Sequence, residues 1–177
     1  MSRLKILYTR EQIAQRVRDV ADRITADFKD EKLVLVGILK GAAFLLTDLA
    51  REIDAPVGYE LVDVNATPGE RGEVVNLSYA THFNLESKHV LILKDVLHTG
   101  VTENYLITHL SQQNPASMNL VALVDKPQLR SVNLEARYAL FNDVPQGYLV
   151  GYGLGTEPSD PVNRPDLCLI EDETPSA

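Results

Sequence analysis

Short apolar runs that alternate with amphipathic segments constrain the fold of this chain more than any other feature. The runs cover residues 33–38, 89–93 and 119–124. Continuous apolar, β-branched sequence is typical of strands that are covered on both faces of a sheet. Apolar residues at helical spacing lie between and before these runs, at residues 13–28, 42–53 and 102–113. The alternation predicts an α/β fold with a central, mainly parallel sheet flanked by helices on both faces.

Local signals complete the predicted order of elements. Thr9 and Gln12 have the spacing of a capping box, which predicts that the first helix begins there. Shorter strands are expected at residues 57–64, 74–77, 137–141, 148–152 and 167–170. Residues 65–72 are rich in turn formers and predict a mobile loop. Since ligands bind beyond the C-terminal ends of parallel strands, we expect functional residues after Ile38, Leu93 and Val124.

Composition limits the class of protein and its partners. The 177 residues favour one domain over 1–177, with 170–177 as a frayed tail. No apolar run is long enough to span a membrane and no signal peptide is recognised, so we expect a cytoplasmic location and no membrane partner. The net charge of −8 argues against a nucleic-acid partner. Cys168 stands alone in an apolar run, which indicates a buried hydrophobe and excludes an internal disulfide.

A candidate anion-binding loop follows the strand that ends at Leu93. In it, Gly100 allows close approach of the backbone, and the Thr99 and Thr102 hydroxyls can donate hydrogen bonds. Free N–H groups at the start of the next helix favour an anion. The alternative is that Thr102 only caps the helix and Gly100 only forms a turn. From these residues alone, the two interpretations are equally supported.

The order of residues in this segment resembles the phosphoribosyl pyrophosphate (PRPP) motif of type I phosphoribosyltransferases. In that motif an apolar strand precedes two acids, two apolar residues, an acid and Thr-Gly-x-Thr. Residues 90–93, Asp95, residues 96–97 and residues 99–102 match it. Residues 36–42, 123–130 and 144–154 resemble, in family order, three segments of the hypoxanthine-guanine branch. The resemblance covers residues 4–170 and implies the type I phosphoribosyltransferase fold, which adds a small hood region to the sheet.

The resemblance also implies a role for each matching residue. His98, Thr99, Gly100, Val101 and Thr102 would cradle the 5′-phosphate, while Asp95 would accept hydrogen bonds from the ribose hydroxyls and contact Mg²⁺. Pyrophosphate would contact Lys40, Gly41 and Arg164, with a Leu39–Lys40 peptide that could be cis. Tyr148 would stack on the purine and the Leu149 backbone would read its edge. Mg²⁺ would be chelated mainly by PRPP, and a homodimer or homotetramer is expected. For Lys40 and Tyr148 the alternatives are a solvated charge and a core aromatic.

Several positions depart from the family pattern. Lys94 stands where the first of the paired acids is expected, so it could face away from the ligand or pair with another acid. His98 replaces the acid that handles the purine N7 proton, a task that histidine can perform, although a loop histidine without a catalytic role is equally supported. Glu135 replaces the lysine that reads the 6-oxo group. Lys126 or Arg137 could substitute for that lysine, or the base could carry an amino group at position 6, which suits a carboxylate better; the alternative is that Glu135 is solvated. Gly155 replaces an acid that helps to hold Mg²⁺. Arg164 lies in a stretch disturbed by prolines. In the mobile loop that would cover the site as a lid, Asn65-Ala66-Thr67 replaces the Ser-Tyr pair of the family.

Two functions remain open at this stage. The first is a purine salvage enzyme that transfers phosphoribosyl from PRPP to hypoxanthine or guanine, giving a nucleoside monophosphate and pyrophosphate. The second is a catalytically impaired sensor that binds PRPP or a nucleotide, because the departures fall on residues of the chemistry and spare the phosphate loop. A receiver-like domain is the weakest hypothesis, since residues 33–38 lack the acidic cluster that it requires.

Overall fold

A computed structural model describes residues 3–69, 72–79 and 84–171. Its main feature is a six-stranded sheet in the order β4-β3-β2-β5-β6-β7. The strands are β2 (Leu33–Ile38), β3 (Val57–Gly69), β4 (Gly72–Tyr79), β5 (His89–Leu97), β6 (Ser117–Asp125) and β7 (Ala136–Phe141). All neighbouring pairs are parallel except β3 and β4. The predicted α/β fold is therefore confirmed.

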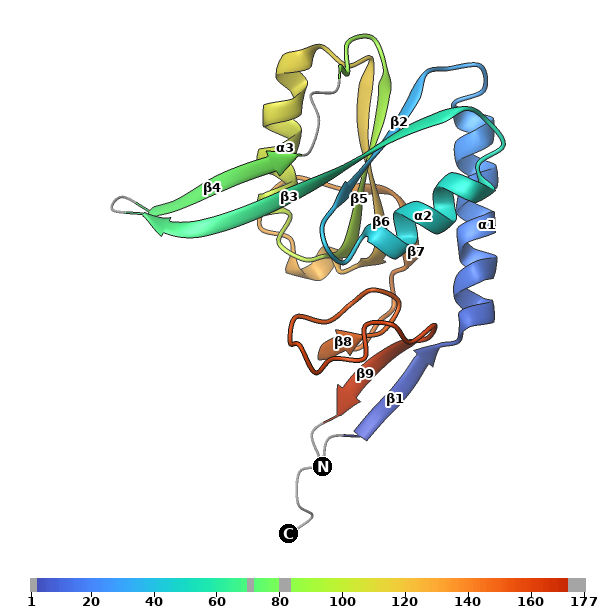
Figure 1. The fold of residues 1–177 in the computed structure, drawn as a ribbon, viewed down its shortest axis with the longest axis vertical. Coiled ribbons are helices and arrows are strands. Elements are labelled where there is room, and N and C mark those ends of the chain that lie inside the picture. The colour runs from blue at the N-terminus through green and yellow to red at the C-terminus, as the bar shows by residue number, and fades with distance from the viewer. Residues whose placement is uncertain (1–2, 70–71, 80–83, 172–177) are drawn as a thin grey trace.

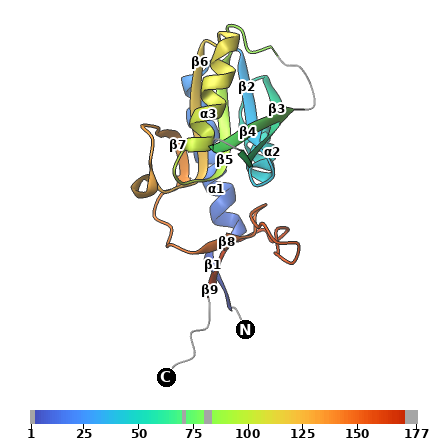
Figure 2. The same cartoon turned by 90° about the vertical axis from the view of Figure 1, so that its left-hand side faces the viewer.

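Helices cover both faces of this sheet, as the apolar runs predicted (Figure 1). All six residues of β2 are buried, which explains its uninterrupted apolar sequence. Helix α3 (Val101–Leu110) packs Leu106 and Leu110 against one face. Helices α1 (Arg10–Asp27) and α2 (Ala43–Glu52) cover the other face and pack into the larger of the two core clusters. Figure 2, seen from the α3 side, shows α3 in front of the sheet. No described helix has both the length and the apolar character needed to cross a membrane.

A second, three-stranded antiparallel sheet forms the hood below the central sheet (Figures 1 and 2). Its order is β1-β9-β8, with β1 (Arg3–Tyr8), β8 (Tyr148–Val150) and β9 (Leu167–Glu171). Strand β1 was not predicted. Four of its six residues are exposed, so burial imposes no clear alternation on its sequence. Pairing with β9, which lies far away in the sequence, decides its conformation.

Several predicted boundaries are wrong, two of them by four residues or more; the strand predicted at 148–152 ends at Val150, and the helix predicted at 102–113 ends at Leu110. Residues 65–69 continue β3 and pair with residues 72–76 of β4, so the predicted mobile loop is a hairpin arm. Hydrogen bonding to the second strand overrides the turn propensity of these residues, and positions 70 and 71 lie outside the described residues. Strand β5 extends to Leu97, four residues beyond its predicted end, because β6 pairs with it as far as Asp125.

The capping box at the start of α1 is confirmed. The Gln12 backbone N–H donates to Thr9 Oγ1 (3.4 Å), and the Thr9 N–H donates to Gln12 Oε1 (2.9 Å). The helix that begins here packs Ile13, Val17 and Ile24 into the core. The cap therefore fixes the point at which the chain leaves β1 of the hood and begins the helix that covers the central sheet.

We expect Thr9→Ala to lower the free energy of unfolding by about 1 kcal/mol, because it leaves the N–H of Gln12 without its side-chain acceptor. Urea denaturation measures the change. The control is Thr47→Ala on the exposed side of α2, where the hydroxyl bonds only within its own helix (to Ala43 O, 2.7 Å). Since alanine has the higher helix propensity, the control should show no loss of stability. Equal effects of the two substitutions would contradict the role given to the cap.

Candidate active site

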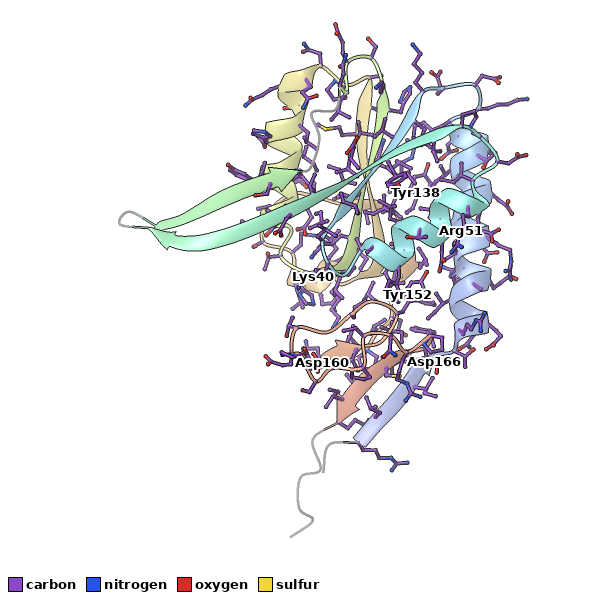
Figure 3. The ribbon with its side chains drawn as sticks, viewed as in Figure 1. Lys40, Arg51, Tyr138, Tyr152, Asp160 and Asp166 are labelled. Atoms are coloured by element: carbon purple, nitrogen blue, oxygen red, sulfur yellow. The ribbon has the colours of Figure 1, made fainter. Side chains whose placement is uncertain are left out.

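The predicted site residues gather at one edge of the central sheet, where β2, β5 and β6 end. Lys40 follows β2, Asp95 and His98 lie at the end of β5, and Lys126 directly follows β6. The Lys126 N–H donates to Leu97 O (3.0 Å), which ties the ends of β5 and β6 together. Figure 3 shows Lys40 at this edge, on the side that faces the hood. The sheet thus brings together residues that are up to 86 positions apart, from Lys40 to Lys126.

The turn after β2 packs directly on Asp95. A Cβ atom added at Gly41 would collide with the Asp95 carboxylate, so only glycine fits here. The Leu39–Lys40 peptide is cis, as the family resemblance implied it could be. The Lys40 side chain is exposed, and among the described residues it makes no hydrogen bond or ion pair. The turn that packs on Asp95 therefore carries an unpaired ammonium among the described residues, at the edge where a ligand of this fold is expected.

The loop after β5 presents free backbone N–H groups at the start of α3. The N-cap is Gly100, with φ of +79°, and an added Cβ would come within 3.0 Å of Val132. The interpretation of Thr102 as a simple N-cap is therefore wrong. The Val101 N–H contacts Thr99 Oγ1 (3.4 Å), whereas in the described structure no acceptor bonds the N–H groups of His98, Thr99, Gly100 or Thr102. Such a row of unpaired donors at a helix start favours an anion.

Arg130 keeps these N–H groups available by binding the carbonyl groups of the loop. Its guanidinium donates to Leu97 O (3.0 Å) and to His98 O, while the Ser131 N–H donates to Thr99 O (3.0 Å). Because the carbonyls are bound on this side, the N–H groups can face the opposite side. Arg130 is fixed in turn by Asp125 and by Leu134 O (2.9 Å). The sequence analysis noted Arg130 only as part of a resemblance and missed this role, which depends on residues 97–99 and 125–134 meeting in space.

His98 lies among cations. Burial lowers the pKa of the His98 imidazole, and the charges of Lys126, Lys94 and Arg130 lower it further, against an opposing effect of Asp95. The ring is therefore neutral near pH 7 and able to accept a proton. Lys126 itself is only 3% exposed, and its Nζ donates to Pro145 O (3.3 Å). Burial lowers the pKa of this ammonium. In a chain of net charge −8, these cations supply the local positive potential that a phosphate needs.

Lys94 pairs with Asp95, which answers the question that its sequence position left open. The Lys94 Nζ lies 2.7 Å from Asp95 Oδ1, and the Val96 N–H donates to the same oxygen (2.8 Å). The described residues contain no group of three or more His, Cys, Asp or Glu side chains that could hold a metal ion. Mg²⁺ requires about six oxygen ligands. The side chains at this edge therefore do not form a complete magnesium site by themselves, and a metal contact of Asp95 would need oxygen atoms of PRPP as further ligands.

The residues expected to bind a base are less clearly grouped. Tyr148 is 38% exposed, and its hydroxyl bonds Asp160 and the Thr156 N–H (2.8 Å). Leu149 belongs to β8, an edge strand whose backbone groups are paired on one side only. Glu135 is exposed at a pocket of about 400 Å³ that Asp125 and Arg130 also line.

Of two further candidate cations, Arg137 lies away from the site, whereas Arg164 lies in the hood, where its carbonyl accepts from the Tyr152 N–H (2.7 Å). The Arg137 guanidinium pairs with Asp27 of α1 (2.9 Å) and lies over the ring of Phe28, on the opposite side of the core. Arg164 lies 3.8 Å from Asp166 in the hood, and no hydrogen bond or ion pair among the described residues joins it to Lys40 or Gly41. Substitution of the missing base-reading lysine by Arg137 is therefore not supported, whereas Lys126 remains suitably placed.

A larger pocket lies away from these residues. It has a volume of about 540 Å³ and is formed by α1, α2 and the hood, with Phe44, Asp48 and Tyr152 in its wall. The Tyr152 hydroxyl donates to Asp48 (2.7 Å) across it. None of the predicted site residues lines this pocket. Size alone therefore does not identify the site, and the free N–H groups at the end of β5 are the stronger indicator.

We expect the His98 ring to titrate below its usual midpoint of about 6.5 in an NMR titration. Lys126→Met should raise that midpoint, because it removes the nearby charge with the largest effect. The unfolded chain binds the proton more readily than the folded chain. Stability should therefore fall as the pH drops from 6.5 towards the lower folded pKa. A midpoint at or above the usual value would contradict this charge distribution.

Comparison with known proteins identifies the family. The model of the phosphoribosyl transferase domain matches residues 4–154. The hypoxanthine-guanine phosphoribosyltransferase of Dictyostelium discoideum is 34% identical over 160 residues, covering 87% of this chain and 88% of that protein. The Staphylococcus aureus (strain Mu50) enzyme of the same name is 34% identical over 152 residues, covering 85% and 84%.

Solved structures agree with this match. A hypoxanthine-guanine phosphoribosyltransferase from Bacillus anthracis superposes with a TM-score of 0.86 at 28% identity, covering 96% of this chain and 99% of that one. The hypoxanthine phosphoribosyl transferase of Trypanosoma cruzi gives a TM-score of 0.84 at 32% identity, covering 94% and 91%. The chain therefore belongs to the phosphoribosyltransferase family, in its hypoxanthine-guanine branch.

Proposed function

We propose that this protein is a purine salvage enzyme that transfers a phosphoribosyl group from PRPP to hypoxanthine or guanine. The observation that carries the proposal is the set of unbonded N–H groups at His98, Thr99, Gly100 and Thr102. The carbonyls of His98 and Thr99 are bound on the other side by Arg130 and the Ser131 N–H. A 5′-phosphate is negatively charged and carries several acceptor oxygens, so it can accept hydrogen bonds from these N–H groups. The relatives named above are transferases of this kind.

The remaining residues have roles that follow from their positions. Asp95 accepts hydrogen bonds from the ribose hydroxyls through Oδ2, because Oδ1 already receives two donors. Lys40 and the Gly41 backbone contact the pyrophosphate beside it. As the C1′–oxygen bond to pyrophosphate breaks and the C1′–nitrogen bond to the base forms, the departing oxygens gain charge that Lys40 stabilises. Arg164 is kept as a pyrophosphate contact by resemblance alone.

The base meets His98, Lys126 and Tyr148 in this proposal. Neutral His98 accepts the proton that the purine loses. Lys126 donates to the 6-oxo group in place of the lysine that Glu135 replaces, since its buried ammonium has only a carbonyl partner in the described structure. The Tyr148 ring stacks on the base, and Asp160 and Thr156 fix its orientation through the hydroxyl. The Leu149 backbone reads the edge of the base from the free side of β8. Mg²⁺ enters as the complex with PRPP, whose pyrophosphate chelates it.

The proposal extends to the domain organisation, location, oligomeric state and partners of the protein. Buried residues of the hood, including Leu149 and Leu167, belong to the same core cluster as α1 and α2, which supports a single domain. A cytoplasmic location and a homodimer or homotetramer remain expectations from the sequence and the family. Binding of nucleic acid is disfavoured by the charge of −8.

The alternative function is a sensor that binds PRPP or a nucleotide without turnover. Its motive is the replacement of acids at Lys94, His98 and Gly155. The comparisons do not favour it, because the similar curated proteins are named as transferases. It predicts nucleotide binding in the absence of any reaction.

The direct test is release of pyrophosphate from PRPP and Mg²⁺ with hypoxanthine or guanine, monitored continuously. We expect steady release that requires the base, with a reaction lacking the base as control. No release, together with calorimetric binding of a nucleoside monophosphate, would favour the sensor instead. Neither release nor binding would remove both functions.

We expect Asp95→Asn to lower kcat/KM for PRPP roughly 5- to 30-fold, because a neutral amide binds the ribose hydroxyls less strongly than a carboxylate. This factor corresponds to a loss of about 1–2 kcal/mol of transition-state stabilisation. The matched control is Asp22→Asn, which makes the same change on the exposed surface of α1. Steady-state kinetics at varied PRPP measure both variants. Equal kcat/KM values for the two would show that Asp95 does not contact the sugar.

A further inference from the structure

Lys94 and Asp95 form an ion pair at the two positions where the family motif has paired acids. The two side chains are 23% and 22% exposed, so water screens their attraction only partly. Asp95 Oδ1 receives both the Lys94 ammonium (2.7 Å) and the Val96 N–H (2.8 Å). The other carboxylate oxygen faces Gly41. Among the described residues, no hydrogen bond or ion pair engages this second oxygen.

A third charged residue lies behind this pair. Residues Val90 and Ile92 of β5 pack on the α3 face, so Lys94 leaves the strand on that same face. Glu103 of α3 is only 3% exposed. Burial raises the pKa of the Glu103 carboxyl, its own backbone N–H and the Lys94 ammonium oppose that rise, and Asp95 adds to it. The Lys94 ammonium therefore acts on two carboxylates, one facing the site and one buried behind it.

We propose that the Lys94 ammonium is a resident cation of the active site, which occupies Asp95 and prevents the free protein from binding a divalent metal there. This inference rests on the proposed function, because it assigns Mg²⁺ to the substrate complex alone. A second cation beside an ammonium is repelled, and one carboxylate oxygen supplies too few ligands for Mg²⁺. The described residues offer no cluster of acids or histidines that could compensate. Asp95 is thus held in place by a charge that does not depend on the metal concentration.

The test is a titration of the free protein with Mn²⁺, without PRPP or base, in which electron paramagnetic resonance reports the unbound ion. We expect the unbound signal to match that of buffer alone for the natural chain. Lys94→Glu replaces the cation by a carboxylate ligand beside Asp95 and should increase Mn²⁺ affinity about tenfold or more. Lys88→Glu, just before the other end of β5, makes the same change in net charge and should leave Mn²⁺ binding unchanged.

One tightly bound Mn²⁺ per natural chain would overturn the proposal, and this arm does not depend on the folding of any variant. A folded Lys94→Glu protein, checked by circular dichroism, that gains no more affinity than Lys88→Glu would also overturn it. Failure of the proposed function is seen separately, because pyrophosphate release is measured with PRPP and base on the natural chain. The two failures are therefore distinguishable.

Discussion

Arg130 makes the hydrogen bonds on which the candidate site depends. Its guanidinium binds carbonyls at the end of β5 and in the following loop, and it is fixed by Asp125 and Leu134 O. A loop needs both its N–H and its carbonyl groups satisfied. Because Arg130 and the Ser131 N–H satisfy the carbonyls, the N–H groups at the start of α3 remain for an anion. These hydrogen bonds of Arg130 also join β5, β6 and the segment before β7 at the sheet edge where ligands of this fold bind.

The distribution of charge explains how an acidic protein can bind phosphate. The chain carries a net charge of −8, yet Lys40, Lys94, Lys126 and Arg130 gather at one sheet edge. Two of these cations are already paired, with Asp95 and Asp125. The other two, Lys40 and Lys126, have no acidic partner among the described residues. The site therefore combines paired cations, which fix its shape, with unpaired ones that can meet a charged ligand.

The departures from the family pattern have different consequences. His98 keeps an acid/base group at its position, in neutral form, so the change need not abolish proton transfer. Lys94 changes the sign of its position and occupies an oxygen of Asp95. At positions 135 and 155 the base-reading lysine and the metal-holding acid of the family are absent. Lys126 lies near enough to His98 to lower the pKa of its imidazole. The loop that would hold the 5′-phosphate keeps the Thr-Gly-x-Thr residues of the family motif at 99–102.

The sequence by itself determined the α/β class and the capping box, and it predicted where the candidate anion-binding loop lies. These follow from local patterns: continuous burial of β2, the spacing of Thr9 and Gln12, and a glycine before a helix. Only the tertiary structure decided the existence of β1, the extension of β3 into a hairpin, and the pairing of Lys94 with Asp95. It also assigned Arg137 to α1 and Arg130 to the loop. The physical reason is that hydrogen bonds and ion pairs between distant segments override local propensity. No pattern within a few residues can show which partner the folded chain supplies.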